Sequence, residues 1–210
     1  PYTGLAAGNT YYNLDLAPSL ATTWNLNSGL MVFGSLSIGG NATLAAGANG
    51  ITVYRDWTNS GSFSSSGNAT FAGTKTSDIT GANTFTDFTC TTPGKTLQFQ
   101  QGVTQQVTGN ITIDGSAGNN IQLLSQAAAV WQFDPPDAGD TVSYVDVEYS
   151  DIVNSTGVIS VNTGQDLGNN DTETGIDAGS WNFTTKVWTG ATSTDWGVAG
   201  NWTGGVPGNT

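Results

Sequence analysis

Short segments in which apolar and polar residues alternate recur along the whole chain, separated by Gly, Asn and Ser. They include residues 30–33 (LMVF), 36–38 (LSI), 51–54 (ITVY), 96–99 (TLQF) and 110–113 (NITI). Each segment predicts a short β-strand, because successive side chains of a strand point to opposite faces. The turn signals are too frequent for most β-sandwiches, and no helical pattern intervenes to form βαβ crossovers. The pattern predicts an all-β fold, a right-handed parallel β-helix (solenoid) of short strands and tight corners.

An internal repeat supports this prediction. Residues 34–45 (GSLSIGGNATLA) and 61–72 (GSFSSSGNATFA) are nearly identical and lie 27 residues apart. A period of this size is typical of solenoids, whose coils bury their apolar faces only by stacking on one another. We therefore expect the two segments to occupy equivalent places on different coils, with Asn41 and Asn68 stacked in a ladder at one corner. Such an architecture indicates a mechanical or adhesive purpose rather than a catalytic one.

The pattern changes near the C-terminus, where Trp and Gly become frequent. We predict a β-helix domain over residues 1–185 and a Trp-rich segment over residues 186–210, which is either a cap or the start of a next repeat unit. Trp188, Trp196 and Trp202 fall within fifteen residues. Three indoles cannot be exposed together without cost, so we expect them to form an interface between units or a binding platform.

The charge balance limits the partners of this chain. Its 210 residues include four basic and sixteen acidic side chains, for a formal net charge of −12. Binding to nucleic acid is not expected, because affinity there depends on cations that neutralise phosphates. Membrane insertion is not expected either, since no apolar run is long enough to span a bilayer. The single cysteine, Cys90, shares its strand face with Phe88, which predicts a small buried thiol. A reactive role is not expected, because the chain has no His to lower the pKa of this thiol.

Two acidic residues have the spacing of a catalytic pair. Asp146 and Glu148 lie two residues apart on one face of the longest predicted strand, residues 141–150, so their stems are roughly 6.6 Å apart. That separation approaches the spacing in inverting glycosidases. A solvated outer strand face is the favoured interpretation, because no partner groups are identifiable and His, the commonest general base, is absent. We therefore predict that the chain is not an enzyme.

A second acidic cluster lies in residues 168–177 (GNNDTETGID). Asp171, Glu173 and Asp177 offer the hard oxygen ligands that calcium prefers, in a loop that does not match the EF-hand spacing. The cluster is either a structural calcium site or, as we favour, a solvated acidic loop. No other cofactor is predicted.

Several segments resemble a known class of proteins. Residues 56–63 (DWTNSGSF), 79–85 (ITGANTF), 115–120 (GSAGNN) and 121–125 (IQLLS) followed by Trp131 resemble very long secreted bacterial β-strand-repeat proteins. The Trp-rich tail is similar to the module junctions of those proteins.

This resemblance implies a structural unit of an extracellular filament or cell-surface adhesin, with no catalytic residues. Its partners would be copies of itself or neighbouring repeat units, joined head to tail through the terminal coils. The alternative is a carbohydrate-binding module that binds glycans through the Trp-rich segment. Substitution of Trp196 and Trp202 distinguishes the two. It removes assembly if the chain is a structural unit, and it removes glycan binding if the chain is a carbohydrate-binding module.

Overall fold

Buried and exposed side chains alternate along the short strands, as the sequence predicts. In β4 (Leu30–Val32) and β16 (Ile111–Ile113) the outer two residues are buried and the middle one is exposed. The buried residues of all coils form one narrow apolar core that runs through the molecule.

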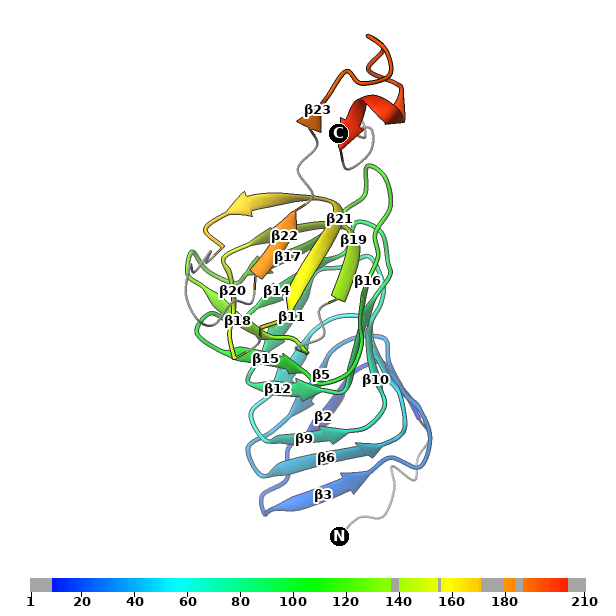
Figure 1. Cartoon of the computed structure of the whole chain (residues 1–210). Helices are drawn as coiled ribbons and strands as arrows, with labels where there is room; N and C mark the ends of the chain where they lie inside the picture. The colour runs from blue at the N-terminus through cyan, green and yellow to red at the C-terminus, as the bar shows by residue number, and fades with distance from the viewer. Residues whose placement is uncertain (1–8, 137–139, 155, 171–179, 184–186, 204–210) are drawn as a thin grey trace.

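The chain folds into a β-solenoid of about 8 turns (Figure 1). This computed structural model describes residues 9–136, 140–154, 156–170, 180–183 and 187–203. The predicted parallel β-helix is confirmed, and no α-helix occurs in the described ranges. No helix found in them is long and apolar enough to cross a membrane.

Each of the first six coils contributes one strand to each of three faces, and all pairing between coils is parallel. Sheet 1 contains the first strands: β1 (Thr10–Tyr11), β4, β7 (Ile51–Val53), β10 (Asn68–Phe71), β13 (Asp87–Cys90) and β16. Sheet 2 contains the second strands and is the longest sheet: β2 (Leu14–Leu16), β5 (Leu36–Ile38), β8 (Trp57–Asn59), β11 (Ser77–Thr80), β14 (Thr96–Phe99), β17 (Ile121–Ser125), β19 (Asp140–Glu148), β21 (Val158–Gly168) and β22 (Ser180–Phe183).

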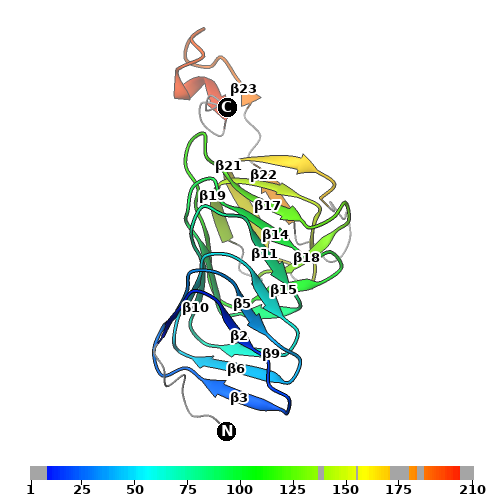
Figure 2. The same ribbon diagram turned by 180° about the vertical axis from the view of Figure 1, so that it is seen from behind.

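The third face consists of two sheets in succession. The first holds β3 (Thr22–Asn25), β6 (Ala42–Gly47) and β9 (Ser62–Ser65), and the second holds β12 (Asn83–Phe85), β15 (Thr104–Val107), β18 (Trp131–Asp134) and β20 (Ser150–Ile152). Figure 2 shows the first three strands of this face stacked at the N-terminal end of the solenoid. A small antiparallel pair, β23 (Val187–Trp188) and β24 (Trp202–Thr203), follows the solenoid with a short 3-10 helix, η1 (Ala199–Asn201).

The register of the coils differs from the predicted one. Leu44 pairs with Phe63, not with Phe71 as the 27-residue repeat requires. Residues 34–45 form β5 and β6, whereas residues 61–72 form β9 and β10, so the repeated motif sits at two different corners. The predicted 27-residue period is therefore wrong. The repeated motif encodes two strands joined by a tight turn, and this local pattern can occur at any corner of a three-sided coil.

The predicted Asn ladder is also wrong. The Asn41 amide donates to the carbonyls of Pro18 and Ser19, whereas the Asn68 amide donates to Thr70 Oγ1 within its own strand. The two asparagines lie on different faces because the register differs. A polar ladder exists inside the solenoid instead, formed by the buried side chains of Asn59, Asn83 and Gln105.

Candidate functional site

A column of aromatic side chains runs along the corner between sheets 1 and 2. Tyr12, Phe33 and Tyr54 each follow directly after β1, β4 and β7, whose last residues are in register. The side chain of Tyr12 is 70% exposed and that of Phe33 is 45% exposed. The rings of Phe33 and Tyr54 lie with their centroids 5.0 Å apart. Stacked coils repeat at about 4.8 Å, so the solenoid itself sets this spacing.

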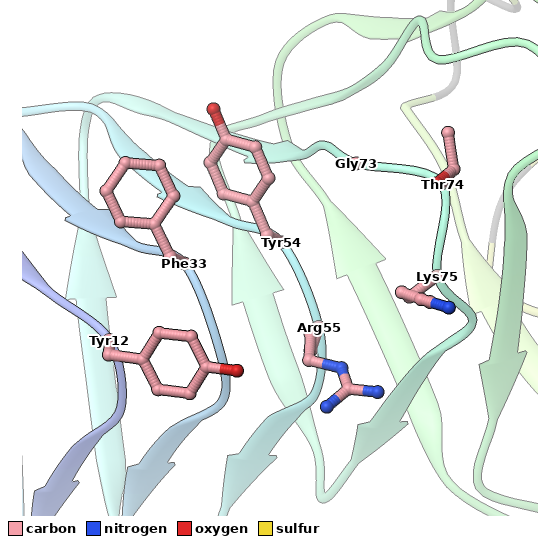
Figure 3. Close-up of a pocket in the computed structure, with 7 residues that line it drawn as sticks. All are labelled: Tyr12, Phe33, Tyr54, Arg55, Gly73, Thr74 and Lys75. Carbon is pink, nitrogen blue, oxygen red and sulfur yellow. The ribbon is translucent and has the colours of Figure 1, made fainter.

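These rings border a surface groove of about 310 Å³, which we call the corner groove. Its lining is shown in Figure 3 and consists of Tyr12, Phe33, Tyr54, Arg55, Gly73, Thr74 and Lys75. In that view the phenol of Tyr12 is directed toward the guanidinium group of Arg55, and Lys75 lies on the far side of the groove. The groove thus combines aromatic faces with cationic groups.

The cations of the groove are conspicuous in a chain that has only four basic residues. Arg55 and Lys75 are both exposed, and within the described part of the chain neither side chain forms an ion pair. Asp56, the acidic neighbour of Arg55, is engaged elsewhere, because its carboxylate accepts hydrogen bonds from Ser35 Oγ and the Asp78 backbone N–H. The groove therefore places two exposed cationic side chains side by side on a strongly negative molecule.

A third cation lies beneath the groove. Lys95 is fully buried, and its ammonium group donates to the backbone carbonyls of Lys75 at 2.7 Å and Tyr54 at 3.4 Å. Burial lowers the pKa of Lys95, an effect that nearby Cys90 and Asp56 partly oppose. The side chain ties together two of the coils that form the groove.

On the next coil Gly73 lies against the ring of Tyr54, the last ring of the aromatic column. Its φ of +71° is in the left-handed region, and a Cβ atom there would lie 2.9 Å from Tyr54 Cδ1. Only glycine combines this backbone conformation with room for the ring. The position thus places Tyr54 directly against the following coil.

The residues of the groove offer groups that can bind a ligand. Aromatic rings offer apolar faces, and an exposed guanidinium group can form paired hydrogen bonds with a carboxylate. The lining contains no carboxylate, cysteine or histidine.

The structure brings the predicted Trp-rich residues together. The rings of Trp188 and Trp196 stack at 5.1 Å, and Trp202 meets both edge-on at 5.1 and 5.0 Å. We call these three residues the Trp cluster. The indoles thus cover one another within the β23–β24 segment, although Trp196 remains 65% exposed. Whether the segment is a cap or the start of a next unit stays a prediction.

A buried asparagine organises the Trp cluster. Asn201 Oδ1 accepts hydrogen bonds from the backbone N–H groups of Thr192 and Ser193, and its amide donates to Ser193 Oγ and the Asp195 carbonyl. These bonds close the loop between β23 and β24. The loop in turn places Trp196 over the other two indoles.

The predicted calcium ligands Asp171, Glu173 and Asp177 lie outside the described residues. In the ranges that are described, no group of three or more His, Cys, Asp or Glu side chains could hold a metal ion. The structural calcium site and the favoured solvated acidic loop therefore both stay predictions.

The acidic pair on the long strand differs from the expectation of a solvated face. Asp146 is buried, and its Oδ1 accepts hydrogen bonds from Asn120 Nδ2 at 2.7 Å and the Gln165 N–H at 2.9 Å. The expected exposure was wrong for Asp146, because donors from both neighbouring coils replace water around its carboxylate. Glu148 is only half-buried.

Sequence reasoning missed the corner groove. Tyr12, Phe33 and Tyr54 are spaced by 21 residues each, and Arg55 and Lys75 by 20. That spacing matches the pairing of Leu30 with Ile51 and was the available signal. The more obvious 27-residue repeat concealed it.

Comparison of the chain with protein-family models, curated proteins and solved structures found no match.

Proposed function

We propose that this chain is a structural unit of an extracellular bacterial filament or cell-surface adhesin, and that such units stack head to tail through their terminal coils. The observation that carries the proposal is the position of the first coil, whose three strands β1, β2 and β3 each lie at the end of their sheet. Open sheet edges are templates for pairing, and natural solenoids either cap them or use them for joining. Copies of the same chain or neighbouring repeat units are the proposed partners.

The edge presented by β3 supports this proposal in detail. The backbone N–H groups of Thr22 and Leu26 donate to the carbonyls of Asn41 and Ala45 on the second coil. Because alternate residues of a parallel strand point to opposite neighbours, the N–H groups of Thr23 and Asn25 point away from the solenoid. The nearby side chain of Leu20 is 77% exposed. A coil added at this end would pair with the free backbone groups and cover this leucine.

The test blocks that edge without removing an internal hydrogen bond. Proline at position 23 removes an N–H group that faces outward, whereas Thr23→Ala keeps it and serves as the matched control. Sedimentation velocity and negative-stain electron microscopy of the purified chain measure assembly. Filaments from the wild type and Thr23→Ala, with monomers from Thr23→Pro, support stacking. A wild-type chain that stays monomeric as its concentration rises contradicts it.

Structural calcium at Asp171, Glu173 and Asp177 forms a separate part of the proposal. Oxygen ligands in an acidic loop suit this ion, and its charge would offset part of the net −12. Electron microscopy with and without a chelator tests it. Filaments that dissolve on chelation and return with added calcium support it, and filaments that are indifferent to chelation contradict it.

A carbohydrate-binding module is the second candidate, favoured by the exposure of Trp196 next to two other indoles. Such a surface can stack on sugar rings. If Trp196→Ala abolishes glycan binding and leaves the oligomeric state unchanged, this candidate gains support. If the same variant abolishes assembly instead, the Trp cluster acts as an interface between units.

A further inference from the structure

We propose that the corner groove binds an acidic polysaccharide, with sugar rings on its aromatic column and sugar carboxylates on Arg55 and Lys75. This site is separate from the Trp cluster. It also goes beyond the proposed head-to-tail stacking of units, since a single chain is enough to bind the polysaccharide. The ligand class follows from three features of the groove, which are its direction, its aromatic spacing and its unpaired cations.

The direction of the groove suits an extended polymer. Its lining residues come from four successive coils, so it spans three coil steps, or about 14 Å, along the solenoid axis. Tyr12, Arg55 and Lys75 are exposed along this length. A chain of sugars can therefore lie along the groove and extend beyond it at both ends.

The aromatic column presents one ring per coil. Phe33 and Tyr54 lie 5.0 Å apart, a distance comparable with the length of one pyranose ring. Sugar rings have an apolar face of C–H groups that stacks on aromatic side chains, and their hydroxyls keep contact with water. The half-exposed setting of Phe33 leaves room for such stacking.

The cations select a carboxylated sugar. Arg55 and Lys75 have no ion-pair partner in the described part of the chain, and Asp56 is engaged by Ser35 and Asp78. A guanidinium group matches the planar carboxylate of a uronic acid, while an ammonium group offers a point charge beside it. Lys95 holds the backbone of Tyr54 and Lys75 together from below, so both sides of the groove are fixed before binding.

Single-stranded nucleic acid is the competing polyanion, and the charge balance disfavours it. Its affinity depends on many phosphate contacts, whereas the groove offers two exposed cations on a chain of net charge −12. A uronate sugar can instead be held by the paired hydrogen bonds that a guanidinium group forms with a planar carboxylate.

Isothermal titration calorimetry of the purified chain tests the proposal with three probes. These are oligogalacturonate, the same oligomer fully methyl-esterified, and oligothymidylate. We expect binding of oligogalacturonate, and a loss of about tenfold or more both on esterification and in Arg55→Gln/Lys75→Gln, because charge-assisted hydrogen bonds are lost. Phe33→Ala should weaken binding too, through lost stacking.

A charge-matched control distinguishes the loss of the two cations in the groove from the change in the net charge of the chain. Ser62→Glu/Ser64→Glu also makes the chain more negative by two charges, but at exposed positions of β9 on the third face. This control should keep most of the affinity, and thermal unfolding verifies that every variant is folded.

The proposal is overturned by any of three results. These are absence of oligogalacturonate binding, equal binding of the esterified oligomer, or unchanged affinity in Arg55→Gln/Lys75→Gln. Tighter binding of oligothymidylate overturns it in favour of nucleic acid. None of these results depends on the Thr23→Pro assembly assay, so the two proposals can fail separately.

Discussion

The indole Nε1 of Trp57 donates a 2.8 Å hydrogen bond to Oδ1 of Asn83, which lies on the next coil of the solenoid. The same oxygen accepts from the Asn59 amide at 3.1 Å, and the Asn83 amide donates to Gln105 Oε1 at 2.9 Å. All four side chains are buried. This network links three coils through polar contacts inside an otherwise apolar core, where unpaired polar groups are costly.

Asn83→Ala should therefore destabilise the fold strongly. It leaves the Trp57 indole, the Asn59 amide and Gln105 without their shared partner, and we expect a loss of about 2–4 kcal/mol in the free energy of unfolding. Urea denaturation measures it. Thr84→Ala is the control, because Thr84 is exposed on the same strand and makes one hydrogen bond, to Gln106. Similar losses in the two variants would show that the buried ladder contributes little.

Gly73→Ala should cost more than Gly102→Ala. Both glycines have positive φ, +71° and +64°, so alanine strains the backbone at either position by about 1 kcal/mol. At Gly73 the new Cβ would also meet the Tyr54 ring, whereas nothing lies within 4 Å at Gly102. We expect a further loss of about 1 kcal/mol for Gly73→Ala in urea denaturation. Equal losses would mean that the Tyr54 ring moves aside freely.

Asn201→Ala should unfold the Trp cluster without unfolding the solenoid. The substitution removes all four hydrogen bonds that close the loop over residues 192–195. We expect loss of the exciton coupling between stacked indoles in circular dichroism, together with an unchanged main unfolding transition. Thr194→Ala is the control, since Thr194 is exposed in the same loop. A retained exciton signal in Asn201→Ala would refute this role of the asparagine.

The folded chain should lose stability through Cys90 as the pH rises from about 9 to 11. Burial raises the pKa of this thiol from 9.0 to about 11, so the fold favours the neutral form. Its contribution is fully present below pH 9 and is lost as the pH rises through 11, with an upper limit of roughly 3 kcal/mol.

Lys95 changes the stability of the fold with pH in the opposite direction to Cys90, over an overlapping pH range. Its lowered pKa means that the fold penalises the charged form, so stability rises with pH until the ordinary value of 10.5 is passed. Urea denaturation of the wild type and Cys90→Ala across this range measures the thiol together with its effect on the pKa of Lys95, which is present in both. A difference in stability that does not change with pH would contradict the expected titration of Cys90.

The alternating pattern by itself determined the strands and the fold class. In strands such as residues 36–38 and 51–53 every second side chain is buried, and only stacking on neighbouring coils can bury it. The burial of Cys90 was predicted in the same way and is confirmed. These properties depend on residues that are close in the sequence, where the physical constraint is local.

Only the tertiary structure decided which residues meet between coils. Partners lie 18 residues apart at Ile51 and Ala69 but 28 apart at Thr104 and Gln132, so no single period describes the register. The corner groove, the burial of Asp146 and the closure of the Trp cluster all depend on this register or on loop geometry. Tight corners of a solenoid tolerate insertions, and each insertion changes the register of every later coil without changing the local alternation that predicts the strands.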